Sequence, residues 1–455
     1  MSVDQIGLKE FESGFGGSIV REGDAGYDEA REVFNAMIDK RPAVIAACSS
    51  VEDVREAIRW GRGSGLPIAV RAGGHSVAGL SLNDGGLVID VRGLNDVEVD
   101  AAAKTIRVGG GTVWGEFDAA CKPHALAATG GRVTTTGVAG LTLGGGSGWM
   151  ERKMGLACDN LIAVELMTAD GRLMNATERE NPELFWALHG GGGNFGIATS
   201  LTFRLSSIPA FTAGILLWPA SAGLEVARAY RSIAEAAPDD FGGGFGFLTG
   251  PPEEFVPEHL QGTIVAGVII GYAGPEAELR ALIEPLLALK PDGAVVMELP
   301  YHDFNGMLDD PPGLQNWWTA EYHDGLPDAM LAEFCALAAP MKPSSSQVVL
   351  IPWGGAVGRN TDTPMANRHS TWVSHPFILW EDPAENAERI KFGKDLQAML
   401  RTYSNGGTYL NFIGLEGQDR VVAAFGEDNY RRLAKVKAEF DPDNIFHGNQ
   451  NIMPG

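Results

Sequence analysis

The residues of this chain that are best suited to chemistry stand together in the segment Arg71–Ser76, which reads Arg-Ala-Gly-Gly-His-Ser. It follows the apolar run 67–70, which has the pattern of a buried strand. Two adjacent glycines let the backbone turn sharply and approach a ligand, and N–H groups in such a turn bind anions such as a pyrophosphate. His75 adds a nucleophilic imidazole. On this segment alone, the alternative is a histidine packed in the core.

Glycine is unusually frequent: it accounts for 60 of the 455 residues, clustered at 109–111, 130–131, 137–148 and 190–196. Gly191, Gly193 and Gly196 form a literal G-x-G-x-x-G. A dinucleotide fingerprint follows a strand and opens a helix, whereas this one follows a predicted helix and opens a predicted strand, so we reject a Rossmann site. Separate glycine-rich loops converging on one long ligand would suit a flavin dinucleotide, which has two phosphates and a large ring.

Short strands, turns and a few helices alternate from Arg41 to about Ser207. Ser49 and Glu52 form a capping box that predicts a helix after them. Strands are expected at 87–91 and 105–108. The runs 162–168 and 172–176 flank Ala-Asp-Gly, which predicts a hairpin.

The pattern changes near Ile208-Pro209. Beyond it, longer helical patterns at 222–237 and 276–289 alternate with β-rich runs at 263–272 and 347–353, and aromatic residues gather. These aromatics either build a core or line a pocket for an apolar ring. Because the chain is too long for one core, we predict separate domains at 1–208 and 209–408, and the pattern changes once more at 409–455.

The composition narrows the class of function. The formal net charge of −23 argues against binding to nucleic acid or to an anionic membrane surface. No run approaches the ~20 apolar residues of a membrane span, and the N-terminus lacks a signal pattern. The four cysteines lie far apart, with no C-x-x-C pair and no metal-site spacing, so a reducing cytoplasmic location is expected.

Several motifs in the same order resemble the FAD-linked oxidases of the vanillyl-alcohol-oxidase superfamily, and most closely the berberine-bridge-enzyme family. The resemblance covers residues from about 40 to the end and is weakest from 210 to 400. It rests on the segments 71–76, 83–90, 137–146, 153–160, 183–190, 194–196, 429–433 and 441–446.

The resemblance implies an α+β fold, with a PCMH-type FAD-binding domain that residues 409–455 complete, and a second α+β substrate domain built on an antiparallel sheet. It implies FAD bound through His75 at the flavin 8α-methyl carbon. The cofactor-binding residues that it implies are Arg71, Ala72, Gly73, Gly74, His75, Ser76, Gly79, Thr135, Thr136, Gly137, Gly140, Leu141, Gly144, Gly145, Gly146, Gly148, Asp159, Asn160, Gly196, Ile197, Asn449 and Asn451.

The chain departs from the family at two positions. The second, cysteinyl flavin link of plant members aligns with Val133, so a single covalent bond is expected. The catalytic tyrosine of the plant Asn-Tyr pair is replaced in Asn411-Phe412, and phenylalanine cannot take a proton. Thr136 aligns with a residue that controls oxygen access to the flavin in the family.

A base for the substrate must therefore come from elsewhere, or be unnecessary. The candidates are Tyr409, His375, Tyr322 and Glu321, with Asn411 beside the first. His375 is preferred because imidazole titrates near neutrality; the alternative is a strand-end histidine facing solvent.

The predicted function is an FAD-dependent oxidase that moves a hydride from a C–H next to N or O of a small, ring-containing substrate to flavin N5. O2 then reoxidises the flavin and gives H2O2, and the protein is expected as a monomer or homodimer. The alternatives are a dehydrogenase with another acceptor, a flavin-binding protein without turnover, and a nicotinamide-fed reductase, against which His75 argues.

Overall fold

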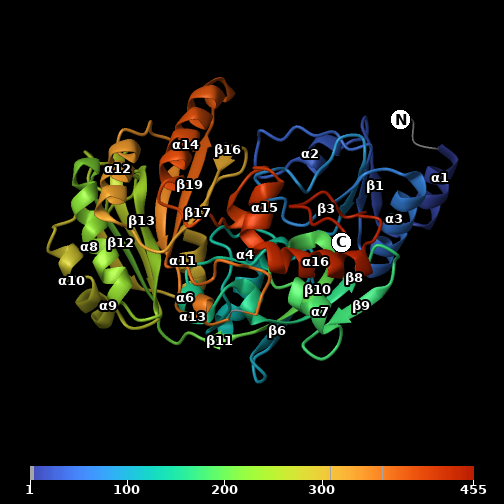
Figure 1. Ribbon diagram of the computed structural model, residues 1–455, viewed down its shortest axis with the longest axis horizontal. Coiled ribbons are helices and arrows are strands. Elements are labelled where there is room, and N and C mark those ends of the chain that lie inside the picture. The colour runs from blue at the N-terminus through green and yellow to red at the C-terminus, as the bar shows by residue number, and fades with distance from the viewer. Residues whose placement is uncertain (1–4, 308, 361) are drawn as a thin grey trace.

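Helices and sheets, most of them antiparallel, are mixed along the chain, in agreement with the α+β fold that the family resemblance implies. The computed structural model describes residues 5–307, 309–360 and 362–455. In Figure 1 the N-terminal half, blue to green, forms one side of the molecule and the yellow-green to orange segment forms the other. The red C-terminal helices return to the first side.

The first sheet places the segment around His75. Its strand order is β1-β2-β4-β3, with β4 parallel to both β2 and β3. The predicted helix between β2 and β3 is α3 (Val51–Ser64), and its cap differs from the prediction: Ser50, rather than Ser49, accepts a hydrogen bond from the N–H of Asp53. The strands are β1 (Ser18–Val20), β2 (Val44–Ala47), β3 (Ile68–Arg71) and β4 (Leu87–Asp90).

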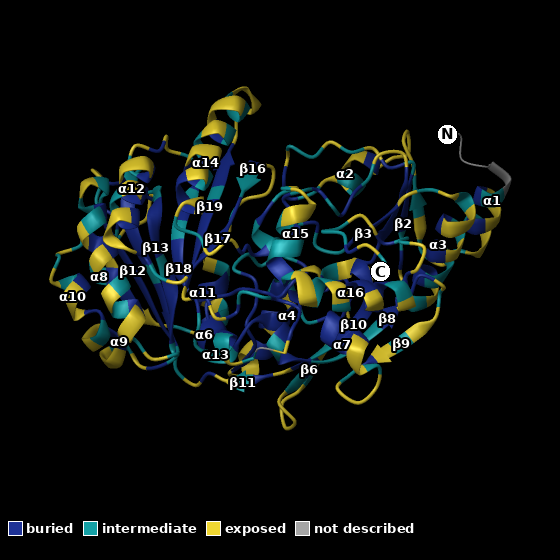
Figure 2. Ribbon diagram, in the orientation of Figure 1, coloured by how far each residue is buried: buried dark blue, intermediate teal, exposed yellow. Residues whose placement is uncertain are grey.

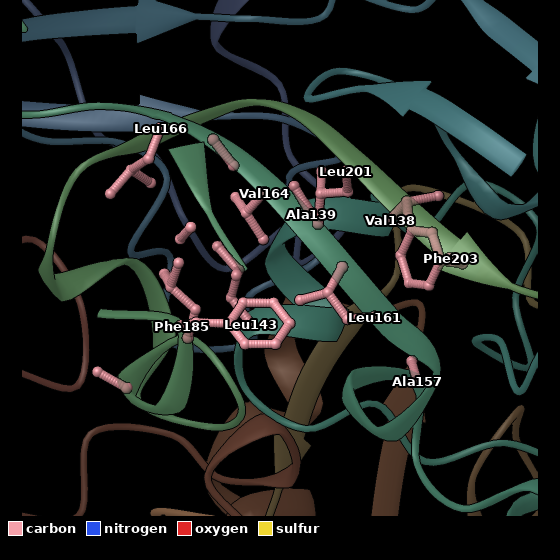
Figure 3. Close-up of a cluster of buried hydrophobic side chains, with 14 of the residues drawn as sticks. Val138, Ala139, Leu143, Ala157, Leu161, Val164, Leu166, Phe185, Leu201 and Phe203 are labelled. Atoms are coloured by element: carbon pink, nitrogen blue, oxygen red, sulfur yellow. The ribbon is translucent and has the colours of Figure 1, made fainter. Parts of the chain in front are cut away.

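The second sheet is antiparallel, in the order β5-β6-β10-β8-β9. Its β8–β9 pair is the predicted hairpin around Asp170-Gly171. A short helix, α5 (Val138–Leu143), packs Val138, Ala139 and Leu143 into the hydrophobic cluster beside this sheet (Figure 3), so its opposite side remains free for a ligand. The strands are β5 (Val97–Asp100), β6 (Thr105–Gly109), β8 (Leu161–Met167), β9 (Leu173–Ala176) and β10 (Ile197–Arg204).

The large sheet of the second half has eight strands, with main order β15-β12-β14-β13-β18-β19-β16 and β17 paired to β19. Its strands are β12 (Thr212–Pro219), β13 (Phe241–Thr249), β14 (Ile264–Tyr272), β15 (Gly293–Glu298), β16 (Gln315–Trp318), β17 (Glu321–His323), β18 (Gln347–Pro352) and β19 (Trp372–Trp380).

The two faces of this sheet have different partners because side chains alternate along a strand. Val348 and Leu350 point into a core shared with helices, whereas Val349 and Ile351 point to the opposite face. In Figure 2 the strands of this sheet are mostly dark blue, which marks buried residues, and the helices that cover it are yellow on the side that faces solvent. The helices are α8 (Gly223–Ala236), α9 (Glu276–Leu282), α10 (Glu284–Leu287), α12 (Asp328–Ala338) and α14 (Asn386–Arg401).

The predicted helix 276–289 is wrong as a single helix. Helix α9 ends at Leu282, Ile283 leaves helical geometry, and α10 begins at Glu284 with Pro285 in its first turn. Proline has no N–H to donate and clashes with the preceding turn, so it begins a new helix instead of continuing the old one.

The C-terminal helices α15 (Gln418–Phe425) and α16 (Glu427–Phe440) pack on the N-terminal half. Phe425 and Leu433 belong to the same hydrophobic cluster as Leu201 of β10. No helix in the described part of the chain is both long and apolar enough to cross a membrane. The remaining α-helices and strands of the described chain are α1 (Gln5–Gly14), α2 (Tyr27–Arg31), α4 (Trp114–Cys121), α6 (Glu151–Met154), α7 (Pro182–Ala187), α11 (Tyr301–Met307), α13 (Ala356–Arg359), β7 (Leu126–Ala127) and β11 (Ser206–Ser207).

Candidate active site

A cavity of about 500 Å³ lies where the N-terminal half, the large sheet and the C-terminal tail meet. Its floor is formed by the turn after β3, the free side of α5 and the glycines 190–193. Its roof is the face of the large sheet that the helices leave free, with Ile269, Val349 and Phe377. The alternation along the strands therefore gives this sheet one face for the core and one for a ligand.

Most of the predicted site residues lie on the wall of this cavity. They come from the segments 72–76, 136–144 and 196–197 of the first half, from β19 and from the C-terminal segment. These residues are Ala72, Gly73, Gly74, His75, Ser76, Thr136, Gly137, Gly140, Leu141, Gly144, Gly196, Ile197, His375, Tyr409, Asn411 and Asn449.

His75 is held on three sides. Its Nε2 lies 2.8 Å from the hydroxyl of Thr135, its Nδ1 lies 3.3 Å from that of Thr136, and its ring stacks on Phe34 at 4.2 Å between centroids. Burial lowers the pKa of His75 to about 4, so the imidazole is neutral at pH 7. A neutral imidazole in a fixed orientation is a competent nucleophile.

The glycine-rich loops touch through their backbones. A Cβ on Gly73 would lie 2.2 Å from the backbone nitrogen of Gly137, so only glycine permits this contact. The N–H groups of Gly74, His75 and Ser76 donate to no acceptor among the described residues, and they border the cavity. Such a row of free N–H groups suits an anionic ligand.

Two further glycines leave open space at the cavity wall. A Cβ on Gly140 or on Gly193 would meet no described atom within 4 Å. Asn449, from the C-terminal tail, bonds through Nδ2 to Gly193 O at 3.3 Å, while its buried Oδ1 has no partner among the described residues. The loops, the open glycines and this unpaired amide oxygen together suit a long, polar ligand such as FAD.

The roof carries a neutral histidine among aromatic rings. His375 stacks on Phe412 at 4.1 Å between centroids and lies edge-on to Trp318 at 6.0 Å. Its Nδ1 lies 2.9 Å from the carbonyl oxygen of Thr319 and must carry the proton, because a carbonyl only accepts. The other nitrogen, Nε2, is therefore an acceptor on a residue of the cavity wall.

The environment of His375 also sets its charge. Burial is the largest effect and lowers the pKa of His375 to about 4, and Arg132 acts in the same direction. The alternative of a strand-end histidine facing solvent is therefore wrong, because His375 is buried in β19.

Tyr409 lines the cavity, but its hydroxyl is engaged. The hydroxyl oxygen accepts hydrogen bonds from the N–H groups of Gly146 at 2.6 Å and Ser147 at 3.0 Å, and from the amide of Asn411 at 3.1 Å. Burial raises the pKa of Tyr409 above its usual value. Asn411 also donates to Leu141 O at 2.9 Å, so both residues anchor the C-terminal segment to the floor.

Two other candidate bases, Glu321 and Tyr322, are absent from the described cavity wall. Glu321 is 1% exposed and accepts hydrogen bonds from Arg401 at 2.9 Å and Arg420 at 2.8 Å. Tyr322 packs on Trp353 at 5.6 Å. Glu321 therefore belongs to the ion pairs that join β17 to α14 and α15, and Tyr322 belongs to the hydrophobic cluster around Trp353.

Nine predicted cofactor residues lie behind the wall. Arg71 bonds to the carbonyls of Ala30 and Glu32, and Asp159 pairs with Arg368. The others fix loops through backbone geometry or hydrogen bonds within the protein. They are Gly79, Thr135, Gly145, Gly146, Gly148, Asn160 and Asn451.

Several wall residues were not predicted. Arg132 donates to Ser147 at 3.0 Å and to Glu151 at 3.3 Å, and its guanidinium lies 4.9 Å from the ring centre of Trp149. Asp310 and Gln347 also line the cavity. No local motif marks these residues, since only the tertiary contacts of their loops and strands bring them to the wall.

The comparisons with known proteins agree with this geometry. The family model described as FAD binding domain matches residues 42–177, and the one described as berberine and berberine like matches residues 408–453. The (R)-6-hydroxynicotine oxidase of Paenarthrobacter nicotinovorans is 30% identical over 460 residues, which cover 96% of this chain and 97% of that protein.

Solved structures extend the likeness to three dimensions. The 6-hydroxy-D-nicotine oxidase from Arthrobacter nicotinovorans has a TM-score of 0.83 at 28% identity, covering 97% of this chain and 98% of that one. Xylooligosaccharide oxidase from Myceliophthora thermophila has a TM-score of 0.86 at 21% identity, covering 100% of both chains, which shows a shared fold alone. The chain belongs to the berberine-bridge-like family of FAD-linked oxidoreductases.

Proposed function

We propose that this protein is an oxidase that removes a hydride from a C–H next to N or O of a small, ring-containing substrate, with O2 as the final acceptor and H2O2 as product. FAD, when bound, supplies the hydride acceptor and the reaction with O2. The observation that carries the proposal is the neutral His375, whose Nε2 acceptor lies in an aromatic roof over a floor suited to FAD.

His75 holds the cofactor covalently in this proposal, through the flavin 8α-methyl carbon. The depressed pKa keeps its lone pair available, and the hydroxyls of Thr135 and Thr136 fix its ring. Val133, at the position of the second link in plant members, has no nucleophilic atom. A single covalent bond follows from these residues.

His375 acts on the substrate as a hydrogen-bond acceptor and base. The Thr319 carbonyl fixes the tautomer by accepting from Nδ1, so Nε2 receives the O–H or N–H proton of the group next to the oxidised carbon. Phe412 and Trp318 hold the ring in place and exclude water. Phe412 itself cannot take a proton, so this histidine assumes the role that the family gives to a tyrosine.

The lining of the roof supports a ring-containing, largely apolar substrate. Trp318, Phe377, Val349 and Ile351 present apolar surface, and Gln347 adds a single amide. A sugar would require many hydrogen-bonding groups, each left unpaired against such a wall. The name of the 6-hydroxynicotine oxidase relative, which gives a ring compound as its substrate, supports the same class.

A substrate screen on the purified protein tests the proposal. Cyclic amines, benzylic alcohols and oligosaccharides are each mixed anaerobically with the protein while the visible flavin spectrum is recorded, and H2O2 is measured after air is admitted. We expect a cyclic amine or aromatic alcohol to bleach the flavin and air to restore it with one H2O2 per cycle. Bleaching that air reverses only slowly would indicate a dehydrogenase, and bleaching by oligosaccharides alone would contradict the substrate class.

A further inference from the structure

A short strap crosses the His75 end of the cavity. It runs from Asp309, whose Oδ1 accepts a hydrogen bond from Thr134 N at 2.7 Å, to Leu314, whose carbonyl accepts from Ala36 N at 2.9 Å. Thr134 precedes Thr135 and Thr136, whose hydroxyls bond the His75 ring. Ala36 lies two residues after Phe34, whose ring stacks on that of His75. The strap therefore joins the two sides of the His75 environment.

Asp310 lies in this strap and on the cavity wall. Its neighbour Asp309 is bonded to Thr134, whereas the carboxylate of Asp310 forms no hydrogen bond or ion pair with any described residue. Burial, and then the charge of Asp309, raise the pKa of Asp310 to about 7. An unpaired, half-buried carboxylate whose charged form is disfavoured in this way is a stronger base than an exposed one.

Among the described residues of the cavity wall, the other titratable groups already have hydrogen-bond partners or a proposed role. Arg132 is bonded to Ser147 and Glu151, and the Tyr409 hydroxyl accepts from two backbone N–H groups. The ring of His375 is separated from that of His75 by Trp318 and Phe34, which lie edge-on at 6.1 Å. Among the described residues of the wall, Asp310 is therefore the base without a partner at the His75 end of the cavity.

We propose that Asp310 is the base that removes a proton from the flavin 8α-methyl carbon when His75 forms its covalent bond to that carbon. The inference rests on the covalent link of the proposed function and adds the residue that makes the methyl group reactive. It concerns the maturation of the enzyme, because the substrate reaction is assigned to His375 at the roof.

The atoms and electrons of this step balance. One C–H bond of the 8-methyl group breaks, its proton passes to Asp310, and the electron pair enters the flavin ring. A lone pair of the His75 imidazole forms the new C–N bond, and the imidazole N–H proton is released. The product is a covalently bound flavin reduced by two electrons, and O2 accepts those electrons and two protons to become H2O2.

The test measures covalent incorporation rather than turnover. Wild type, Asp310→Asn and the control Asp303→Asn are produced under flavin limitation and incubated with excess FAD. Asp303 is an exposed carboxylate of α11 that pairs with Lys122 and does not line the cavity. The acid-stable flavin fluorescence of the protein is followed with time, and the total bound FAD is measured in parallel. We expect Asp310→Asn to bind FAD fully but to attach it about 100-fold more slowly, and Asp303→Asn to attach it near the wild-type rate.

Each other outcome overturns the inference. Attachment at the wild-type rate in Asp310→Asn would show that another group takes the proton. Failure of Asp310→Asn to bind any FAD would make Asp310 a binding residue instead of a base. If wild type itself holds only acid-labile FAD, the covalent link of the proposed function fails, and this inference fails with it.

Discussion

At the scale of single residues, the roles of two neighbours at the site are set by their hydrogen bonds. The Tyr409 hydroxyl accepts from Gly146 and Ser147, whereas His375 donates from Nδ1 to Thr319 and keeps Nε2 free. A group whose polar atom is consumed in anchoring cannot also exchange a proton with substrate at low cost. In the proposed reaction His375 is therefore the base, and Tyr409 is an anchor.

Replacing His375 by phenylalanine tests the first role. Phenylalanine keeps a ring on Phe412 but has no acceptor, so we expect kcat/KM to fall about 10²- to 10⁴-fold with normal flavin content. For the wild-type enzyme we also expect a pH dependence. Protonation of Nε2 removes the acceptor, so kcat/KM should be constant at pH values above the depressed pKa of about 4 and should fall as the pH drops through that value. Steady-state kinetics of both proteins from acid to neutral pH measure this, and an unaffected variant would remove His375 from the mechanism.

Replacing Tyr409 by phenylalanine tests the second role. The change leaves two buried N–H groups without their acceptor, so we expect a loss of about 2 kcal/mol in the free energy of unfolding. Turnover of the folded variant should change far less than in His375→Phe. Urea denaturation followed by fluorescence gives the first quantity, and a stable variant with abolished turnover would instead make Tyr409 the base.

At the scale of elements, helix α16 holds the glycine loop and the tail against the cavity. Lys437 is 0% exposed, and its Nζ donates to Asn194 O at 2.7 Å, Phe446 O at 2.9 Å and Asp441 Oδ2 at 2.6 Å. Burial lowers the pKa of Lys437, and the Asp441 carboxylate opposes this. One side chain thus joins α16, the loop before β10 and the tail that carries Asn449.

Replacing Lys437 by methionine should break this junction. The change leaves Asp441 buried without its cation, so we expect a loss of about 3–5 kcal/mol in the free energy of unfolding and weaker retention of FAD. Lys435 lies on the same helix but is exposed, so Lys435→Met should change stability by less than about 0.5 kcal/mol. Urea midpoints of the two variants compare them directly; equal midpoints would contradict a structural role for the buried pair.

The same scale shows what local sequence could predict. The β8–β9 hairpin was predictable because Asp170-Gly171 supplies a turn between two strand patterns. The helix cap was misplaced because Ser49 with Glu52 and Ser50 with Asp53 have the same spacing, and only the structure shows which serine caps. Pro285 should have divided the helix 276–289, since a proline inside a helical pattern is a stop signal.

At the scale of the whole molecule, the sequence predicted the floor of the site better than its roof. The glycine loops are local signals, because each requires close backbone contact, as between Gly73 and Gly137. Asp310 and Arg132 reach the cavity only through the tertiary placement of a strap and a loop, which no periodicity encodes. Asp159 was expected beside the cofactor, yet its carboxylate is paired with Arg368 behind the wall.

We infer that the floor of the cavity, with the C-terminal tail beside it, holds FAD through a covalent bond to His75. The first measurement to make is the visible spectrum of the purified protein before and after acid precipitation, with His75→Ala alongside. Both proteins should be yellow, and the flavin should stay in the acid pellet of wild type and leave that of the variant. Flavin that leaves the wild-type pellet would rule out the covalent link, and protein that binds no flavin even with added FAD would rule out a flavin site in this cavity.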